Sequence, residues 1–144
     1  MGTTLDGEPF DIDRAQAAGP GRWMLVNFFA SWCTPCQVEH PELKRFHDAH
    51  AATGDAEVVS VPFQDSESDI RAFFERNGGG WPVLADAKSS TVLDFGVYKL
   101  PESYLVAPSG KVYAKFIGGF DADEADRLIA QATAAAPPAT GGRS

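Results

Sequence analysis

Residues 23–36 read WMLVNFFASWCTPC, an apolar run followed closely by two cysteines with two residues between them. Seven consecutive residues, 23–29, are apolar except for Asn27. Such continuous apolarity is typical of a strand buried on both faces, as in a parallel sheet. From about Thr34 to Ala52 we expect a long helix, bent at Pro41 because proline removes a backbone donor. The two cysteines therefore stand where a buried strand passes into a helix.

The segments on either side complete the predicted fold. A second apolar strand around Val58, Val59 and Val61 follows the long helix and closes a right-handed βαβ unit. The later segments are predicted from helix caps, turn residues and periodicity: a helix from Ser66 to 78–80, a short helix over 92–95, a hairpin of 104–106 with 112–117, and a helix from Asp121 to about Ala135. Leu5, Phe10 and Ile12 predict a short N-terminal edge hairpin.

This order of elements predicts an α/β fold. A βαβ unit, then a helix, then a ββα unit gives one domain over residues 1–135, with a mixed central sheet flanked by helices on both faces. Residues 136–144 contain nothing apolar beyond Ala and Pro, so we expect a flexible tail.

The composition excludes several classes of function. The chain has 144 residues, enough for one domain. Twelve Lys and Arg against 20 Asp and Glu give a net charge of −8, which argues against nucleic acid because phosphates need clustered cations. No apolar run approaches the ~20 residues that span a bilayer, and no signal or anchor is visible in this chain. We expect a monomer.

Cys33 and Cys36 are the only cysteines, and their placement favours redox chemistry. A disulfide closing so short a loop adds little stability, so a structural staple is disfavoured. Cys33 is expected at the helix N-terminus, where free N–H groups and the helix dipole favour a thiolate. Cys36, one turn on, is expected to be the buried partner that attacks Cys33. Pro35 suits an early helical position, and Trp32 offers an apolar surface to a partner chain. The alternative is a pair of buried, inert thiols.

Zinc binding is a further alternative for the two cysteines, with His47 and His50 as the remaining ligands. The spacing C-x2-C-x10-H-x2-H departs from the zinc-finger pattern. Cys36 and His47 are expected on one helix, roughly 16 Å apart along its axis, and metal bonds of about 2.0–2.3 Å cannot bridge that distance. We therefore predict no metal, with His47 and His50 solvated. For His40 we also favour a surface position, with a place beside the cysteines as the alternative.

The same residues resemble a known family. Residues 28–36, FFASWCTPC, are similar to the strand-to-helix signature of the thioredoxin superfamily, and the likeness runs from about Leu5 to Ala130. CQVEHP at 36–41 resembles the TlpA, ResA and DsbE (CcmG) group, which carries a Glu three residues after the second Cys. LDFGVYKLPES at 93–103 is similar to the Gly-Val-Tyr-Gly-x-Pro-Glu-Thr segment of DsbE proteins, from which Lys99 and Ser103 depart.

The resemblance implies a thioredoxin fold and an extracytoplasmic thiol–disulfide oxidoreductase without metal or organic cofactor. In it Cys33 attacks a disulfide of a client protein, apocytochrome c being one candidate, and Cys36 resolves the mixed disulfide. A membrane protein would supply the electrons. It also implies that Pro101 is a cis-proline facing the cysteines. The residues expected to meet the client or border the cysteines are Trp32, Thr34, Pro35, Pro101 and Glu102.

Glu39 is the remaining catalytic candidate. It lies three residues after Cys36, so both side chains share one helix face. We expect Glu39 to exchange a proton with the Cys36 thiol through a water, the alternative being a solvated helix residue. Thioredoxin carries a buried Asp where this chain has Asn27, a polar residue in an apolar strand that must find hydrogen-bond partners. Asp65 is a weaker candidate.

Three other functions compete with this one. A disulfide oxidant of the same fold differs only in its reduction potential, and a change of about 30 mV in that potential corresponds to ~1.4 kcal/mol. A non-catalytic thioredoxin-like binding module would use Trp32 and nearby aromatics without turnover. A copper-delivery protein is disfavoured because it would need three residues between the cysteines. Trp81 and Tyr98 are interpreted as core or rim aromatics.

Overall fold

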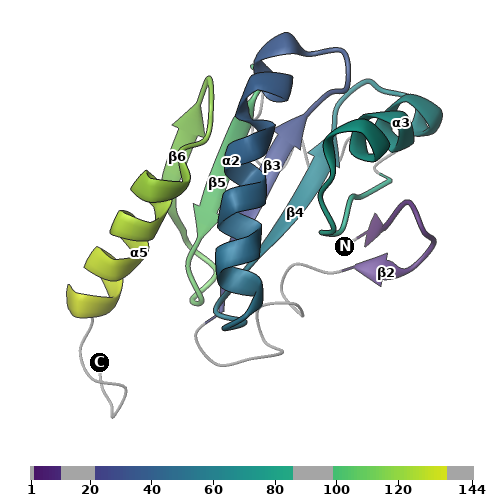
Figure 1. The fold of residues 1–144 in the computed structure, drawn as a ribbon. Helices are drawn as coiled ribbons and strands as arrows, with labels where there is room; N and C mark the ends of the chain where they lie inside the picture. The colour runs from purple at the N-terminus through teal and green to yellow at the C-terminus, as the bar shows by residue number, and fades with distance from the viewer. Residues whose placement is uncertain (1, 11–21, 86–98, 136–144) are drawn as a thin grey trace.

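The computed structural model describes residues 2–10, 22–85 and 99–135 (Figure 1). Its central sheet has the strand order β4-β3-β5-β6. The strands are β3 (Trp23–Phe29), β4 (Ala56–Pro62), β5 (Glu102–Val106) and β6 (Val112–Ile117). β3 pairs with β4 in parallel and with β5 antiparallel, and β5 pairs antiparallel with β6. The predicted mixed sheet is confirmed.

The N-terminal hairpin is formed by two short strands. β1 (Gly2–Thr3) and β2 (Pro9–Phe10) pair antiparallel in a two-stranded sheet of their own. An isolated bridge between Thr4 and Leu84 joins this hairpin to the segment after α3. Ile12, the helix expected over 92–95, Tyr98 and the tail 136–144 lie outside the described residues.

The helices begin at capping residues that the sequence provides. α2 (Thr34–Ala51) has Cys33 as its N-cap, with Pro41 inside the helix. α3 (Glu67–Asn77) begins after Ser66, whose side chain accepts from the Asp69 N–H, and ends at Gly78 with φ 80°. α5 (Ala122–Ala135) follows Asp121, whose carboxylate accepts from the Glu124 N–H. No described helix is both long enough and apolar enough to cross a membrane.

Side chains of β3 alternate between two apolar cores. Leu25 and Phe29 pack in one cluster with residues of α2, α3 and α5, among them Leu43, Phe73 and Ile129. The alternate residues of the strand pack in a second cluster with β4 and β5, formed by Met24, Val26, Phe28, Val59, Val61, Leu84, Tyr104 and Val106. In Figure 1, α2 crosses in front of the sheet, with α5 on the β6 side and α3 on the β4 side. Both faces of β3 are buried, as its apolar run predicts.

The favoured surface position for His40 is wrong. His40 is 3% exposed, and its Nε2 lies 2.7 Å from the Gly78 carbonyl oxygen. Its ring makes contacts with those of Phe73, Phe74 and Trp81 at centroid distances of 4.9–5.3 Å. Burial lowers the pKa of His40, so the neutral ring serves as packing between α2 and the end of α3.

His50 is not a solvated helix residue either. Its Nδ1 lies 2.8 Å from Asp55 and its Nε2 2.7 Å from Asp126, which ties the end of α2 to the start of β4 and to α5. Burial opposes its charge, but the hydrogen bonds to Asp126 and Asp55 outweigh burial and raise the pKa of His50 above 6.5. The ring of His47 packs against Trp81 instead.

The His50 cluster predicts a pH-dependent contribution to stability. Because the folded-state pKa is raised, the contribution is fully present below about pH 6.5 and is lost as pH rises through the folded-state value. We expect His50→Gln to lower the free energy of unfolding by up to about 1 kcal/mol near pH 5.5, and by less near pH 9. Urea unfolding of both proteins at the two pH values measures this difference. An equal loss at both would contradict the assignment.

Candidate active site

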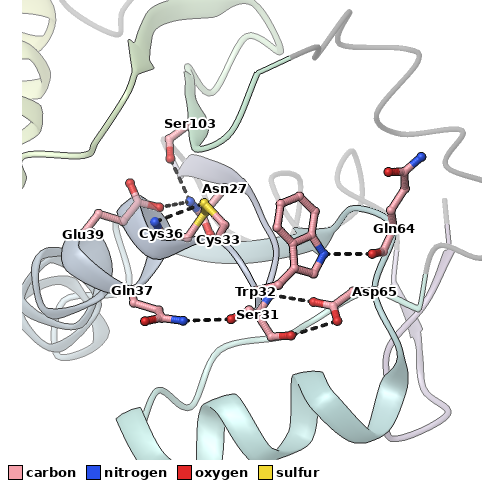
Figure 2. Close-up of a disulfide and its surroundings, with 10 residues drawn as sticks. All are labelled: Asn27, Ser31, Trp32, Cys33, Cys36, Gln37, Glu39, Gln64, Asp65 and Ser103. Atoms are coloured by element: carbon pink, nitrogen blue, oxygen red, sulfur yellow. Dashed lines mark hydrogen bonds between the residues drawn. A yellow bond between two sulfur atoms is a disulfide. The ribbon is translucent and has the colours of Figure 1, made fainter.

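A disulfide joins Cys33 and Cys36 at the N-terminus of α2 (Figure 2). Cys33 adopts an extended backbone, φ −90° and ψ 112°, and caps the helix: its Sγ accepts from the Cys36 N–H at 3.2 Å. After reduction this amide would stabilise a thiolate on Cys33, because helix N-terminal N–H groups favour negative charge. The N-terminus of α2 therefore favours negative charge on the sulfur of Cys33.

Both cysteines are buried in the structure. Cys33 is 6% exposed and Cys36 is 2% exposed in this disulfide form, so the burial expected of Cys36 is found and Cys33 is only slightly more exposed. Cys33 is reached through a cavity of about 390 Å³. The cavity is lined by Trp32, Cys33, Thr34, Pro35, Phe63, Lys99 and Leu100. Cys36 does not belong to that lining, and so the order of access expected for the two cysteines is kept.

The loop before Cys33 is held from the β4–α3 connection. Trp32 is 57% exposed, and its indole N–H donates to the Gln64 carbonyl at 3.0 Å. Asp65 accepts from the Ser31 N–H at 2.6 Å and from the Ser31 hydroxyl at 2.8 Å. Figure 2 shows these contacts beside the disulfide. Asp65 therefore holds the loop in place, while Phe63 and Gln64, which sequence reasoning missed, border the cavity and anchor the indole.

Pro101 lies directly before β5, and the Leu100–Pro101 peptide bond is cis, the isomer that the resemblance implies. The carbonyl of Pro101 accepts from the Gly118 N–H at 2.9 Å. Leu100 and Lys99, immediately upstream, line the same cavity as Cys33. Lys99 and Leu100 therefore form part of the cavity wall, and Pro101 follows directly after them.

A row of polar side chains crosses the sheet beneath α2. Asn27 pairs in register with Ser60 of β4 and with Ser103 of β5, so the three side chains share one face. Asn27 Nδ2 donates to Glu39 Oε2 at 2.8 Å and to Ser103 Oγ at 3.0 Å, as Figure 2 shows. Ser60 Oγ donates to Asn27 Oδ1 at 3.1 Å. The partners that Asn27 requires are these three residues.

Glu39 is a buried carboxylate one helical turn from Cys36. It is 4% exposed, which excludes the solvated alternative. Burial raises the pKa of Glu39 to about 7, and the hydrogen bonds from Asn27 and the Phe120 backbone offset only part of that rise. A carboxyl group with this pKa can give or accept a proton near neutral pH. Its Oε1 makes no hydrogen bond of good geometry with any described residue.

Glu102 lies on the other face of the sheet. It pairs in register with Phe28, next to the Asn27–Ser103 pair, so its side chain points away from the polar row. The carboxylate is 1% exposed, accepts from the Tyr104 hydroxyl at 2.7 Å and lies 3.8 Å from Lys115 Nζ. Direct contact between Glu102 and a client would require that this carboxylate be uncovered.

Comparisons with known proteins agree with this geometry. The thiol:disulfide interchange protein CycY of Rhizobium leguminosarum is 36% identical over 120 residues, covering 78% of this chain and 62% of CycY. The thiol:disulfide interchange protein DsbE of Allochromatium vinosum is 34% identical over 103 residues, covering 71% of this chain and 55% of DsbE. The chain thus matches less than two thirds of the length of either relative.

The structural comparison points the same way. A solved structure of dsbF from MTB, in mixed oxidised and reduced forms, superposes with a TM-score of 0.77 at 27% identity, covering 90% of this chain and 92% of that one. The thioredoxin fold and the likeness to DsbE proteins are thereby confirmed. The family model described as "AhpC/TSA family" matches residues 2–115, most of the chain, and the protein belongs to this family.

Proposed function

We propose that this chain is a thiol–disulfide oxidoreductase that reduces disulfides of client proteins. One observation carries the proposal: a Cys33–Cys36 disulfide at a helix N-terminus that opens into an apolar cavity. The names of the relatives CycY and DsbE, both thiol:disulfide interchange proteins, support the same chemistry.

Reduction of a client would take two exchanges. The Cys33 thiolate attacks one sulfur of the client disulfide, forms a mixed disulfide and releases the other client sulfur as a thiolate. Cys36 then passes its proton to Glu39 and attacks Cys33 Sγ, which expels the second client sulfur. The client gains two electrons and the chain returns to its disulfide form. A dithiol of a donor protein must then reduce that disulfide.

The cavity beside Cys33 is the proposed client site. Apart from Lys99 and Thr34, its lining is apolar or contributed by Cys33 itself. Trp32 extends it with an exposed ring anchored to Gln64, so ordering this ring on binding costs little further entropy. An extended client segment would lie between Trp32 and the wall formed by Lys99 and Leu100, with its disulfide over Cys33.

The finer parts of the proposal rest on the likeness to DsbE and ResA proteins. We place the activity outside the cytoplasm, with apocytochrome c as a candidate client and a membrane protein as electron donor. The compartment fits a protein that must meet disulfides, since these persist outside the reducing cytosol.

Two alternatives differ in what they require of the site. A disulfide oxidant needs a strongly stabilised Cys33 thiolate, but the buried Glu39 places a carboxylate within one helical turn of Cys36, the partner of Cys33 in the disulfide. A binding module without turnover would need neither sulfur. It would keep its affinity for a client after both cysteines are replaced, whereas the oxidoreductase would lose exchange completely.

The unequal access of the two sulfurs predicts which variant traps clients. Cys36→Ser leaves Cys33 able to attack but removes the resolving sulfur, so mixed disulfides should accumulate. Cys33→Ser leaves only Cys36, which does not line the cavity, and should trap little. Non-reducing electrophoresis after mixing each variant with an oxidised client protein measures both. Equal trapping by the two variants would contradict the assigned roles.

The raised pKa of Glu39 predicts that the rate of disulfide exchange depends on pH. As proton acceptor Glu39 must be ionised, so the rate of resolution should fall as pH drops through about 7. Glu39→Gln should slow exchange by about tenfold to a hundredfold and abolish this step, because it keeps the shape without the titrating group. Stopped-flow exchange with oxidised glutathione across the pH range measures it.

The matched control is Glu75→Gln, which removes an exposed carboxylate from α3 and should leave the profile unchanged. Melting temperatures of both variants separate a loss of proton transfer from a loss of folding. A Glu39→Gln variant that exchanges at the parent rate at every pH would remove Glu39 from the mechanism.

A further inference from the structure

A chain of buried hydrogen bonds runs from Trp81 to Glu39. Trp81 Nε1 donates to Ser60 Oγ at 2.8 Å, and Ser60 Oγ donates to Asn27 Oδ1 at 3.1 Å. Asn27 Nδ2 then donates to Glu39 Oε2 at 2.8 Å. Each of the four residues is 5% exposed or less, so solvent does not compete for these bonds.

The chemistry of the first donor sets the direction of the whole chain. An indole N–H only donates, so Ser60 Oγ must accept from Trp81. The single proton of the Ser60 hydroxyl then goes to Asn27 Oδ1, which leaves the two protons of the amide NH₂ for Glu39 and Ser103. Turning the amide over would set two N–H groups against one serine oxygen and leave the serine proton without an acceptor in this chain, which is costly in a buried site.

The direction of these hydrogen bonds matters because it decides which protonation state of Glu39 is favoured. An N–H group facing a carboxyl oxygen favours the carboxylate, whereas the amide oxygen in that place would favour the protonated acid. We propose that Trp81 and Ser60 are positioning residues for Glu39: through Asn27 they hold an N–H donor against its carboxylate and keep it able to accept a proton. The expected effect on the rate of disulfide exchange rests on the proposed function. The expected effect on the pKa of Glu39 does not.

Few other groups near Glu39 influence its pKa. Glu42, on the same helix, shares with it the lining of a cavity of about 420 Å³, and its own carboxylate accepts from the Ala122 N–H at 2.9 Å. Cys36 is in the disulfide. The rise in the Glu39 pKa is accounted for by burial, opposed by the Asn27 side chain and the Phe120 backbone, without a charged neighbour. Asn27 is therefore the side chain through which Glu39 is tuned.

Trp81→Phe tests the proposal with little change in packing. It removes the N–H donor but keeps an aromatic ring against His40 and Phe74. Without the donor the amide can turn over, so we expect the pKa of Glu39 to rise by about half a unit to one unit. Ser60→Ala, which breaks the same chain one step later, should raise it as well.

The measurement is the ¹³C chemical shift of the Glu39 carboxyl group during a pH titration of the full chain in its disulfide form, assigned with Glu39→Gln. Trp23→Phe is the matched control, because it makes the same substitution at a buried tryptophan of β3 outside the chain of hydrogen bonds. It should leave the pKa unchanged. An unchanged Glu39 titration in both Trp81→Phe and Ser60→Ala would overturn the proposal.

Exchange with oxidised glutathione separates this inference from the proposed function. If both hold, the pH profile of Trp81→Phe moves to higher pH by the same amount as the Glu39 titration. A higher pKa with an unchanged rate profile would uphold the positioning role and remove Glu39 from exchange. A Glu39→Gln variant with slow exchange, beside Trp81→Phe and Ser60→Ala variants with the parent titration, would overturn the positioning role and leave the proposed function standing.

Discussion

The hydrogen bond from Asn27 to Glu39 is the interaction on which the site depends. It places a carboxyl group inside the core, one helical turn from Cys36, where an uncompensated charge would be expensive. Four elements meet around it: β3 contributes Asn27, its neighbours β4 and β5 contribute Ser60 and Ser103, and α2 lays Glu39 over the row. The sheet order, with β3 between β4 and β5, is what brings the two serines to either side of Asn27.

In this arrangement the two cysteines differ in their electrostatic environment as well as in their access to the cavity. The N–H groups at the start of α2 face Cys33 and favour its thiolate. A carboxylate at Glu39 disfavours a second negative charge near Cys36, and a pKa of about 7 lets Glu39 serve as the proton acceptor that the proposed reaction requires. In the proposed reaction, Cys33 would therefore be the nucleophile that is ready before a client arrives, and Cys36 would be activated only by giving up its proton. A site of this kind suits a reaction in which Cys33 attacks first.

Much of this arrangement can be predicted from the sequence, because local patterns determine it. The apolar run at 23–29, the cap at Ser66 and the turn before Val112 each fix an element from neighbouring residues alone. The spacing of Cys36 and Glu39 similarly predicts a shared helix face. What the sequence cannot reveal depends on register between strands. Ser60 and Ser103 lie 33 and 76 residues from Asn27, and only the pairing of the strands brings them together.

The errors at His40 and His50 have the same origin. His40 and His50 look like polar residues on a helix, yet aromatic rings from α3 cover His40, and Asp126, 76 residues away, holds His50 together with the nearby Asp55. Glu102 follows Pro101 in sequence, but strand alternation turns its side chain to the face opposite Asn27. For His40 and His50, contacts far away in sequence decide the environment.

The reduction potential of the Cys33–Cys36 couple tests the central claim most directly. A carboxylate one turn from the pair opposes formation of thiolate, which stabilises the disulfide relative to the reduced form. Equilibration of the full chain with glutathione at pH 7 measures the potential. The account predicts a reducing value, more negative than about −200 mV, within or below the range of glutaredoxins. A value near the roughly −120 mV of a strong oxidant such as DsbA would contradict it.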